Sequence, residues 1–171
     1  MAELILGGQR SGKTARAESL SAAWLAQSAQ HKAVYIATAK ALDDEMRARI
    51  ERHRQDRAER VPRMVTVEEP VRLAEAMAAH AQPGSLVVVD CLTLWLANVG
   101  VQSAGLAGAV SRIRSPLILI SNEIGLGVIP MGRETREYVD ALGRLNQQVA
   151  AVCDRVTLMV AGLPLAVKGG A

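Results

Sequence analysis

Eight residues near the start of the chain have the types and spacing of a phosphate-binding P-loop. They fit the pattern G-x-x-x-x-G-K-[ST] and are Gly7, Gly8, Gln9, Arg10, Ser11, Gly12, Lys13 and Thr14. In this motif backbone N–H groups surround a phosphate, the lysine reaches the β- and γ-phosphates, and the hydroxyl binds Mg²⁺. A glycine-rich turn without a ligand is the alternative, but an apolar run over 4–6 and a helical pattern after the motif favour the P-loop. We therefore predict a nucleoside triphosphate site in which Lys13 and Thr14 act.

A carboxylate follows another apolar run farther along the chain. Residues 86–89 are Leu-Val-Val-Val, and Asp90 comes directly after them. This is the pattern of a Walker B strand, whose terminal aspartate holds Mg²⁺ or its water shell. The pattern alone is weak, but its occurrence in the same chain as a P-loop strengthens it. We predict that Thr14 and Asp90 form a magnesium site.

His53 lies in the most charged part of the chain, within a predicted helix over 43–60. Interleaved acids and arginines of this kind are typical of a solvent-exposed helix with ion pairs one turn apart. Arg52 and Arg54 flank the histidine, and Arg57 follows one turn later. Their positive field favours the neutral imidazole and an anion beside it. The residue types leave two interpretations open: a surface histidine without a role, and a histidine that meets a phosphate.

Strands and helices must bring these groups together. Apolar and β-branched runs predict buried strands over 4–6, 33–37, 86–89, 117–120 and 156–160, and an edge or connecting strand over 61–69. Helical spacings predict helices over 15–30, 43–60, 70–82 and 133–152, while 100–109 is either a loop or a short helix. We expect 156–160 to be the last strand, followed by a short basic tail.

The alternation of helices and apolar strands predicts a P-loop NTPase fold of the α/β class, with a mostly parallel sheet and helices on both faces, in a single domain over 1–171. Right-handed crossovers bring the carboxyl ends of the strands to one edge of such a sheet. Gly7–Thr14, Thr38, Asp90 and Asn122 all fall at those ends. Two glycines follow the polar residues 121–123, which predicts a substrate loop or an ordinary glycine turn.

Composition narrows the possible partners and surroundings. The chain holds two Trp, two Tyr and no Phe, so it lacks an aromatic platform for nucleic-acid bases, and its formal charge of +3 is modest. We expect no nucleic acid partner. Cys91 and Cys153 have neither a disulfide nor a metal-site spacing, so we expect both to be reduced core residues. No apolar run reaches the ~18 residues of a transmembrane helix, and we expect a cytoplasmic protein without a membrane span.

Several segments together resemble one family, the bifunctional adenosylcobinamide kinase / adenosylcobinamide-phosphate guanylyltransferase of cobalamin biosynthesis. The resemblance runs from the first strand to the last. It is carried by the P-loop, Tyr35-Ile36-Ala37-Thr38-Ala39, Asp43-Asp44-Glu45-Met46 leading to Arg49-Ile50-Glu51-Arg52-His53-Arg54, Ser121-Asn122-Glu123-Ile124-Gly125-Leu126-Gly127-Val128-Ile129-Pro130, and Gly143-Arg144-Leu145-Asn146-Gln147.

The resemblance implies two reactions. The enzyme first phosphorylates the hydroxyl of the aminopropanol arm of adenosylcobinamide with ATP or GTP. It then transfers GMP from GTP onto that phosphate through a histidine–GMP intermediate and releases pyrophosphate. The family's guanylylated histidine matches His53, although members commonly carry a second histidine where this chain has Arg52. Covalent catalysis by a neutral imidazole would divide one difficult displacement into two easier ones.

The resemblance also implies further site residues and partners. Matching nucleotide contacts are Ala37, Thr38, Ala39, Arg54, Gln55, Asp56 and Arg57, together with two acids, Glu68 and Asp90. Some members have Glu at the position of Asp90. The cofactor is Mg²⁺, GTP and ATP are substrates with adenosylcobinamide and its phosphate, and the family forms homo-oligomers, trimers in its best-known members. Two alternatives are a monofunctional small-molecule P-loop kinase and a non-catalytic GTP-binding module.

Overall fold

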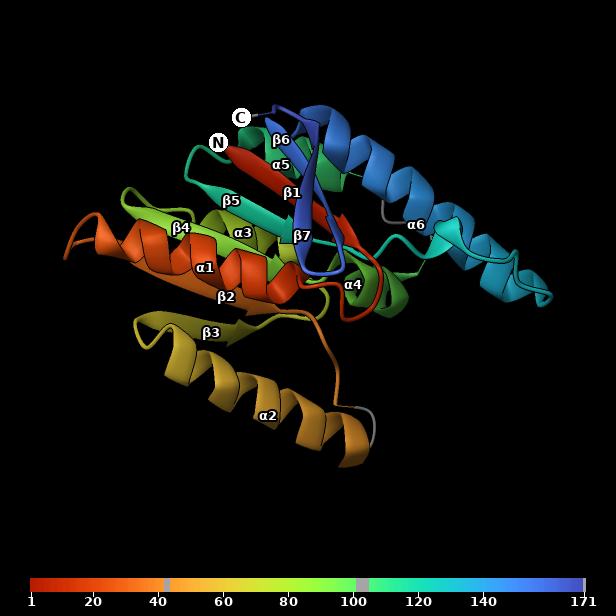
Figure 1. Ribbon diagram of the computed structural model, residues 1–171, viewed down its shortest axis with the longest axis horizontal. Helices are drawn as coiled ribbons and strands as arrows, with labels where there is room; N and C mark the ends of the chain where they lie inside the picture. Colours follow the sequence, from red (N-terminus) through yellow and green to blue (C-terminus); the bar gives the residue numbers. More distant parts are fainter. Residues whose placement is uncertain (42–43, 101–104, 171) are drawn as a thin grey trace.

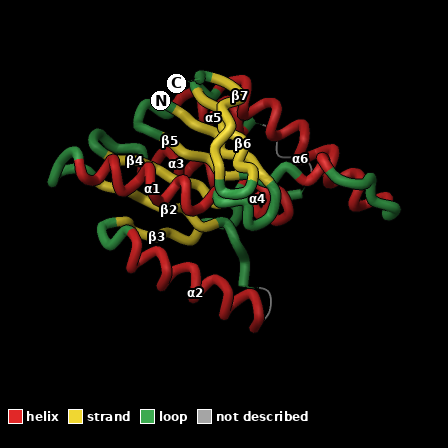
Figure 2. The backbone as a smooth tube through the Cα atoms, in the orientation of Figure 1, coloured by secondary structure: helices red, strands yellow, loops and turns green. Residues whose placement is uncertain are grey.

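The computed structural model describes residues 1–41, 44–100 and 105–170. Its centre is a seven-stranded sheet with the order β3-β2-β4-β5-β1-β6-β7 (Figures 1 and 2). All neighbouring strands are parallel except β6 and β7, which are antiparallel. The strands are β1 (Ala2–Gly7), β2 (Lys32–Ala37), β3 (Met64–Glu68), β4 (Ser85–Asp90), β5 (Leu117–Ile120), β6 (Arg155–Val160) and β7 (Leu163–Lys168). The predicted α/β class with a mostly parallel sheet is confirmed.

Helices cover both faces of this sheet. Side chains of α1 pack on one face, and those of α3, α4, α5 and α6 pack on the other. α2 lies beside the edge strand β3 (Figure 1). The helices are α1 (Lys13–Ala26), α2 (Asp44–Arg60), α3 (Leu73–His80), α4 (Leu92–Val99), α5 (Leu106–Arg112), the 3₁₀ helix η1 (Ile124–Leu126) and α6 (Arg133–Val152).

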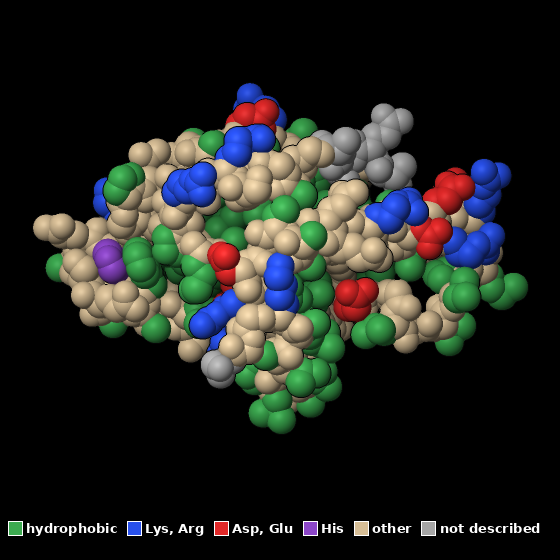
Figure 3. Space-filling view, turned by 90° about the horizontal axis from the view of Figure 1, so that it is seen from above, with side chains coloured by type: hydrophobic (Ala, Val, Ile, Leu, Met, Phe, Trp, Pro, Cys, Tyr) green, Lys and Arg blue, Asp and Glu red, His purple; other side chains and the backbone are tan. Residues whose placement is uncertain are grey.

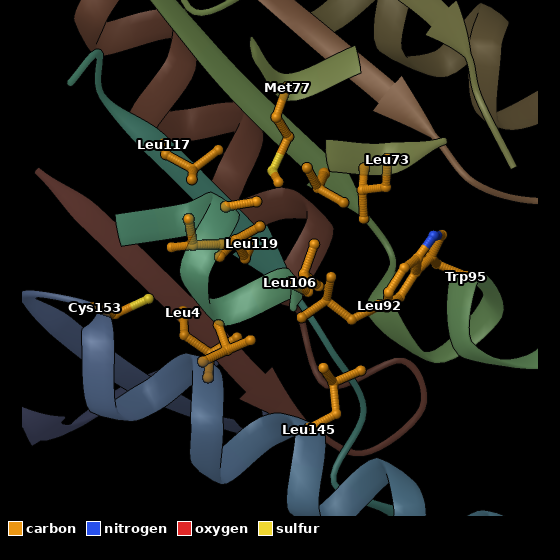
Figure 4. Close-up of a cluster of buried hydrophobic side chains, with 14 of the residues drawn as sticks. Leu4, Leu73, Met77, Leu92, Trp95, Leu106, Leu117, Leu119, Leu145 and Cys153 are labelled. Atoms are coloured by element: carbon orange, nitrogen blue, oxygen red, sulfur yellow. The ribbon is translucent and has the colours of Figure 1, made fainter. Parts of the chain in front are cut away.

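Successive strand residues point into two separate core layers. In β4, Val87 belongs to the layer under α3 to α6 and Val88 to the layer under α1, and both are fully buried. Because both faces of the sheet are covered, its central strands are apolar at consecutive positions rather than at alternate ones. Figure 4 shows the larger layer, in which Leu119 of β5 and Leu145 of α6 face the same apolar interior.

The helix α6 follows its predicted amphipathic pattern and ends against β7. Leu142, Leu145 and Val149 lie on its buried face. At its carboxyl end the Nζ of Lys168 donates hydrogen bonds to the backbone oxygens of Ala150 and Ala151, 2.9 and 3.0 Å away. A cation at this end complements the helix dipole and satisfies carbonyls that have no partner within the helix. The other end of α6 projects beyond the sheet (Figure 1).

The prediction that 156–160 is the last strand is wrong. Ala161 and Gly162 turn the chain with φ angles of 51° and 83°, and β7 then returns antiparallel to β6. The basic tail expected behind Gly162 and Pro164 is this strand. Every residue of β7 is exposed, so it has no apolar face that the sequence pattern could reveal, and an edge strand tolerates a proline.

Other boundaries differ by a few residues. The first helix starts at Lys13, inside the P-loop, and ends at Ala26 rather than near residue 30. The stretch over 100–109 ends in α5, while its residues 101–104 lie outside the described part of the chain, as does Asp43 of the motif before His53. Within the described residues, no helix combines the length and the apolar character needed to cross a membrane.

Candidate active site

The P-loop connects β1 to α1 at the carboxyl edge of the sheet, as its pattern predicts. Gly12 precedes α1 with a φ of 101°, in the left-handed region that glycine enters without strain. The Nζ of Lys13 donates hydrogen bonds to the backbone oxygens of Gly7 (3.0 Å) and Gly8 (2.7 Å). Burial lowers the pKa of Lys13, and the carboxylate of Asp90 partly offsets this. The ammonium group is therefore held inside the loop, where a phosphate would complete its solvation.

Asp90 lies opposite the P-loop at the end of β4. Its Oδ2 accepts a hydrogen bond from the Oγ1 of Thr14, 3.1 Å away, and another from the hydroxyl of Tyr35. Burial raises the pKa of Tyr35 well above its usual value, and the charge of Asp90 raises it further, so the phenol stays protonated and donates. A hydroxyl and a carboxylate in contact are hard oxygen ligands of the kind that hold Mg²⁺ beside nucleotide phosphates. Thr14 and Asp90 thus fit the predicted metal.

One cavity of about 380 Å³ joins the P-loop to α2. His53 and Lys13 both line it, although they come from different helices. The remaining lining residues are Gln9, Arg10, Thr14, Tyr35, Ala37, Ala39, Ile50, Arg57, Glu68, Asp90, Cys91, Leu94 and Asn122. The structure therefore brings the predicted phosphate site, metal site and histidine to the wall of a single cavity.

Some predicted nucleotide contacts lie away from the cavity wall. Thr38 is fully buried, and its Oγ1 donates to the backbone oxygen of Cys91 (2.7 Å) and accepts from its backbone nitrogen (2.8 Å). Arg54 is exposed on α2. On the same helix the Nε2 of Gln55 donates to Glu51 (3.0 Å), and Asp56 lies 3.9 Å from a guanidinium one turn later. Four P-loop residues are not among those that line the cavity; these are Gly7, Gly8, Ser11 and Gly12.

The carboxyl-terminal half of α2 fastens this helix to the rest of the molecule. Arg57 is 4% exposed, its guanidinium carbon lies 3.6 Å from the ring centre of Tyr35, and its Nε donates to the Oγ1 of Thr66 (3.3 Å). One turn further, Arg60 pairs with the buried carboxylate of Glu18 at 3.1 Å. His53, one turn before Arg57, is exposed toward the cavity.

Tyr35 is the residue of this site that sequence reasoning missed as a functional side chain. It was part of the predicted strand over 33–37, whose other members are small or aliphatic. A tyrosine in a buried strand needs a hydrogen-bond partner for its hydroxyl, and the carboxylate predicted at the end of the strand over 86–89 was one candidate acceptor. Leu94 and Cys91 also line the cavity, and no sequence signal assigned either of them to a site. Ile50, from the segment that carries the family resemblance, lines it as well.

A second cavity of about 390 Å³ lies between the loop after β5 and the start of α6. Its lining is apolar on the loop side and charged on the helix side, where Arg133 and Glu137 form an ion pair at 2.8 Å. Leu126, Val128 and Met131 expose 76%, 96% and 96% of their surface nearby. In Figure 3, charged side chains of both signs alternate at this projecting end, with hydrophobic side chains at its tip.

Known proteins resemble this chain over nearly its full length. The family model described as cobinamide kinase / cobinamide phosphate guanyltransferase matches residues 3–167. The bifunctional adenosylcobalamin biosynthesis protein CobP of Pseudomonas aeruginosa is 45% identical over 99% of this chain and 98% of its own length. The corresponding protein CobU of Escherichia coli is 35% identical over 96% of this chain and 98% of its own length.

Among solved structures, the flagellar accessory protein FlaH from Methanocaldococcus jannaschii is similar with a TM-score of 0.60, covering 99% of this chain and 80% of FlaH. Its identity of 13% means that this similarity concerns the fold alone. The family model and the two relatives span almost the whole chain, including the P-loop, His53 and Asp90. This chain therefore belongs to the cobinamide kinase / cobinamide phosphate guanyltransferase family of bifunctional enzymes.

Proposed function

We propose that this chain carries out both reactions of the family at the cavity between the P-loop and α2, with His53 as the nucleophile of the second reaction. The observation that carries this proposal is that Lys13, Thr14 and His53 line one cavity of about 380 Å³. We expect a nucleotide held by the P-loop to have its β- and γ-phosphates beside Lys13 and its α-phosphate facing the part of the cavity that α2 lines.

In the first reaction the hydroxyl of the aminopropanol arm of adenosylcobinamide attacks the γ-phosphorus of ATP or GTP. The bond to the bridging oxygen of the β-phosphate breaks, the hydroxyl proton passes to water, and the nucleoside diphosphate leaves. Lys13 compensates the negative charge on the β- and γ-oxygens, and P-loop N–H groups hold the β-phosphate. Thr14 and Asp90 would hold Mg²⁺, which supplies charge neutralisation at the same oxygens.

In the second reaction the neutral imidazole of His53 attacks the α-phosphorus of GTP. A phosphorus–nitrogen bond forms, the bond to the bridging oxygen of the β-phosphate breaks, and pyrophosphate leaves from the P-loop. A phosphate oxygen of adenosylcobinamide phosphate then attacks the same phosphorus and releases the histidine, which gives adenosyl-GDP-cobinamide. Arg10 and Arg57, both on the cavity wall, supply positive charge to these phosphates.

The remaining nucleotide contacts belong to the same proposal. Ala37 and Ala39 follow β2 on the cavity wall, where their backbone can approach the nucleoside. The carboxylate of Glu68 at the end of β3 also lines the cavity and can accept hydrogen bonds from a guanine. Thr38 holds the segment 37–39 in place through its two hydrogen bonds to the backbone of Cys91. On α2, the proposal also assigns nucleotide contacts to Arg54, Gln55 and Asp56.

The proposal includes a homo-oligomer, a trimer as in the best-known members of the family. Exposed apolar side chains on the projecting loop before α6 support it, because monomers rarely expose a group of large apolar side chains. Replacing Leu126 and Ile129 by aspartate would put charges into such an interface. We expect light scattering to report a homo-oligomer for the unmodified chain and a folded monomer for this variant. A monomer at micromolar concentration in both would contradict this part of the proposal.

A cytoplasmic location is also proposed, since Cys91 and Cys153 are both buried and free and reduced thiols are the rule in that compartment.

The test of the two reactions uses GTP labelled at the α-phosphate, with Mg²⁺ present. The protein should become labelled, and adenosylcobinamide phosphate should remove the label. His53→Ala should lose the label and keep kinase activity with γ-labelled ATP, whereas His80→Ala, a histidine outside the cavity lining, should behave as the unmodified enzyme. Persistent labelling of His53→Ala would refute the nucleophile. Kinase activity without any adduct in the unmodified enzyme would favour a monofunctional kinase.

A further inference from the structure

Tyr35 lies between the two parts of the cavity that the proposed function assigns to the metal and to the nucleophile. It sits in the middle of β2 and is 4% exposed. Its hydroxyl points to Asp90 on β4 and its ring face covers Arg57 on α2. No other side chain in the described residues bonds to Asp90 while stacking on a guanidinium of α2.

The hydroxyl acts on the carboxylate that faces the P-loop. Tyr35 and Thr14 donate to the same oxygen of Asp90, Oδ2. A carboxylate on a short side chain can rotate, and a second hydrogen-bond donor on a metal-binding oxygen fixes its direction. Because Tyr35 is buried and its ring is packed, its donor cannot swing away to another partner. The phenol thereby restricts the rotation of the Asp90 carboxylate.

The ring acts on the helix that carries the histidine. A guanidinium 3.6 Å above an aromatic ring is within stacking distance. Arg57 is four residues after His53, so the two side chains leave the same face of α2 one turn apart. Arg57 is buried and is also hydrogen-bonded to Thr66. The ring of Tyr35 is therefore one of the groups that hold this turn of α2 in place.

We propose that Tyr35 is a positioning residue with two separable effects, in which its hydroxyl orients Asp90 for the metal of the nucleotide complex and its ring supports the turn of α2 that presents His53. This inference rests on the proposed roles of Asp90 and His53. It assigns no bond-making step to Tyr35. Removing the hydroxyl and removing the ring should therefore produce different defects.

The experiment measures metal affinity directly, with Mn²⁺ as the probe and its paramagnetic resonance signal as the readout. The enzyme is saturated with a GTP analogue that cannot be cleaved, and Mn²⁺ is titrated. Tyr35→Phe should weaken Mn²⁺ binding about 10-fold, the lower end of what a lost supporting hydrogen bond to a metal ligand costs. Tyr138→Phe is the matched control, because it removes a hydroxyl bonded to the backbone oxygen of Thr93, away from the cavity.

A second measurement separates the ring from the hydroxyl. His53 labelling by α-labelled GTP at saturating Mg²⁺ should be unchanged in Tyr35→Phe, which keeps the ring, and slowed at least 10-fold in Tyr35→Leu, which does not. In an Asp90→Ala background, Tyr35→Phe should cause no further loss of Mn²⁺ affinity, since the oxygen to which the phenol donates is already gone.

Several results would overturn the inference. These are an unchanged Mn²⁺ affinity in Tyr35→Phe, a loss of Mn²⁺ affinity on adding Tyr35→Phe to Asp90→Ala as large as in the unmodified enzyme, or equal labelling rates for the Phe and Leu variants. Any of these with normal labelling of the unmodified enzyme would leave the proposed function standing. Absence of labelling in the unmodified enzyme would instead count against the proposed function, while the Mn²⁺ titration still decides the role of the hydroxyl.

Discussion

Gly7, the first residue of the P-loop, is a position where even a methyl side chain should destabilise the fold. Its φ is +152°, and a Cβ placed there would lie 2.7 Å from the backbone oxygen of Met159 on the neighbouring strand and 2.5 Å from the Oγ of Ser11. The serine can rotate away, but the backbone of β6 is held by its pairing with β1. We therefore predict that Gly7→Ala destabilises the fold.

The magnitude follows from two costs. A residue other than glycine at a positive φ costs about 1–2 kcal/mol, and the contact with the backbone oxygen adds about 1–3 kcal/mol as β1 and β6 separate. A loss of about 3 kcal/mol in the free energy of unfolding corresponds to a fall of about 6–12 °C in Tm for a chain of this size. Urea titration and a thermal scan, each followed by circular dichroism, measure both quantities.

Gly8→Ala is the matched control for this prediction. A Cβ at Gly8 meets no atom within 4 Å and its backbone does not require glycine, so its free energy of unfolding should change by less than about 0.5 kcal/mol. A Gly7→Ala protein as stable as the unmodified chain would refute the reasoning. Equal destabilisation by both substitutions would also refute it, because it would show that the loop as a whole resists any side chain.

Three further predictions concern the core, the attachment of α2 and the thiols. Leu145→Ala should lower the free energy of unfolding by about 2–5 kcal/mol in urea titrations, since Leu145 is 2% exposed against the sheet; a change below 1 kcal/mol would contradict the packing of α6. Arg60→Ala should lower Tm because it leaves the carboxylate of Glu18 buried without its partner, and adding Glu18→Gln should restore part of the loss; a double variant less stable than the single one would argue against the pair. Burial raises the pKa of Cys91 and Cys153 to about 11, which leaves roughly one thiol in a thousand ionised at pH 8. Iodoacetamide should therefore modify both slowly at pH 8 in the folded protein and quickly in urea, as followed by mass spectrometry, and rapid modification of the folded protein would contradict their burial.

Local sequence patterns predicted those parts of the fold that depend on neighbouring residues. The apolar runs of β1, β4 and β5 and the helical spacing of α6 are strong because both sheet faces and one helix face are buried. The strand β7 was missed for the opposite reason. Its residues are exposed on both faces, and it is held by backbone pairing with β6, which leaves no trace in hydrophobic periodicity.

The candidate site likewise has parts that local sequence motifs predict and parts that depend on tertiary packing. The phosphate loop and the carboxylate at the end of β4 follow from motifs within single segments, and the structure brings Thr14 and Asp90 into contact. That His53 lines the same cavity depends on how α2 packs, and only the family resemblance pointed to it. The stacking of Arg57 on Tyr35 joins β2 to α2, and no spacing within either segment encodes it.

The central claim is that GMP becomes attached to His53 in the cavity that holds the P-loop. Incubation with GTP and Mg²⁺, digestion with a protease that cleaves after glutamate, and tandem mass spectrometry of the peptide 52–59 test it most directly. We predict that GMP is found on the imidazole of His53, that the adduct is lost in acid, and that adenosylcobinamide phosphate removes it. GMP on another residue, or release of pyrophosphate with an unmodified His53 throughout turnover, would contradict the claim.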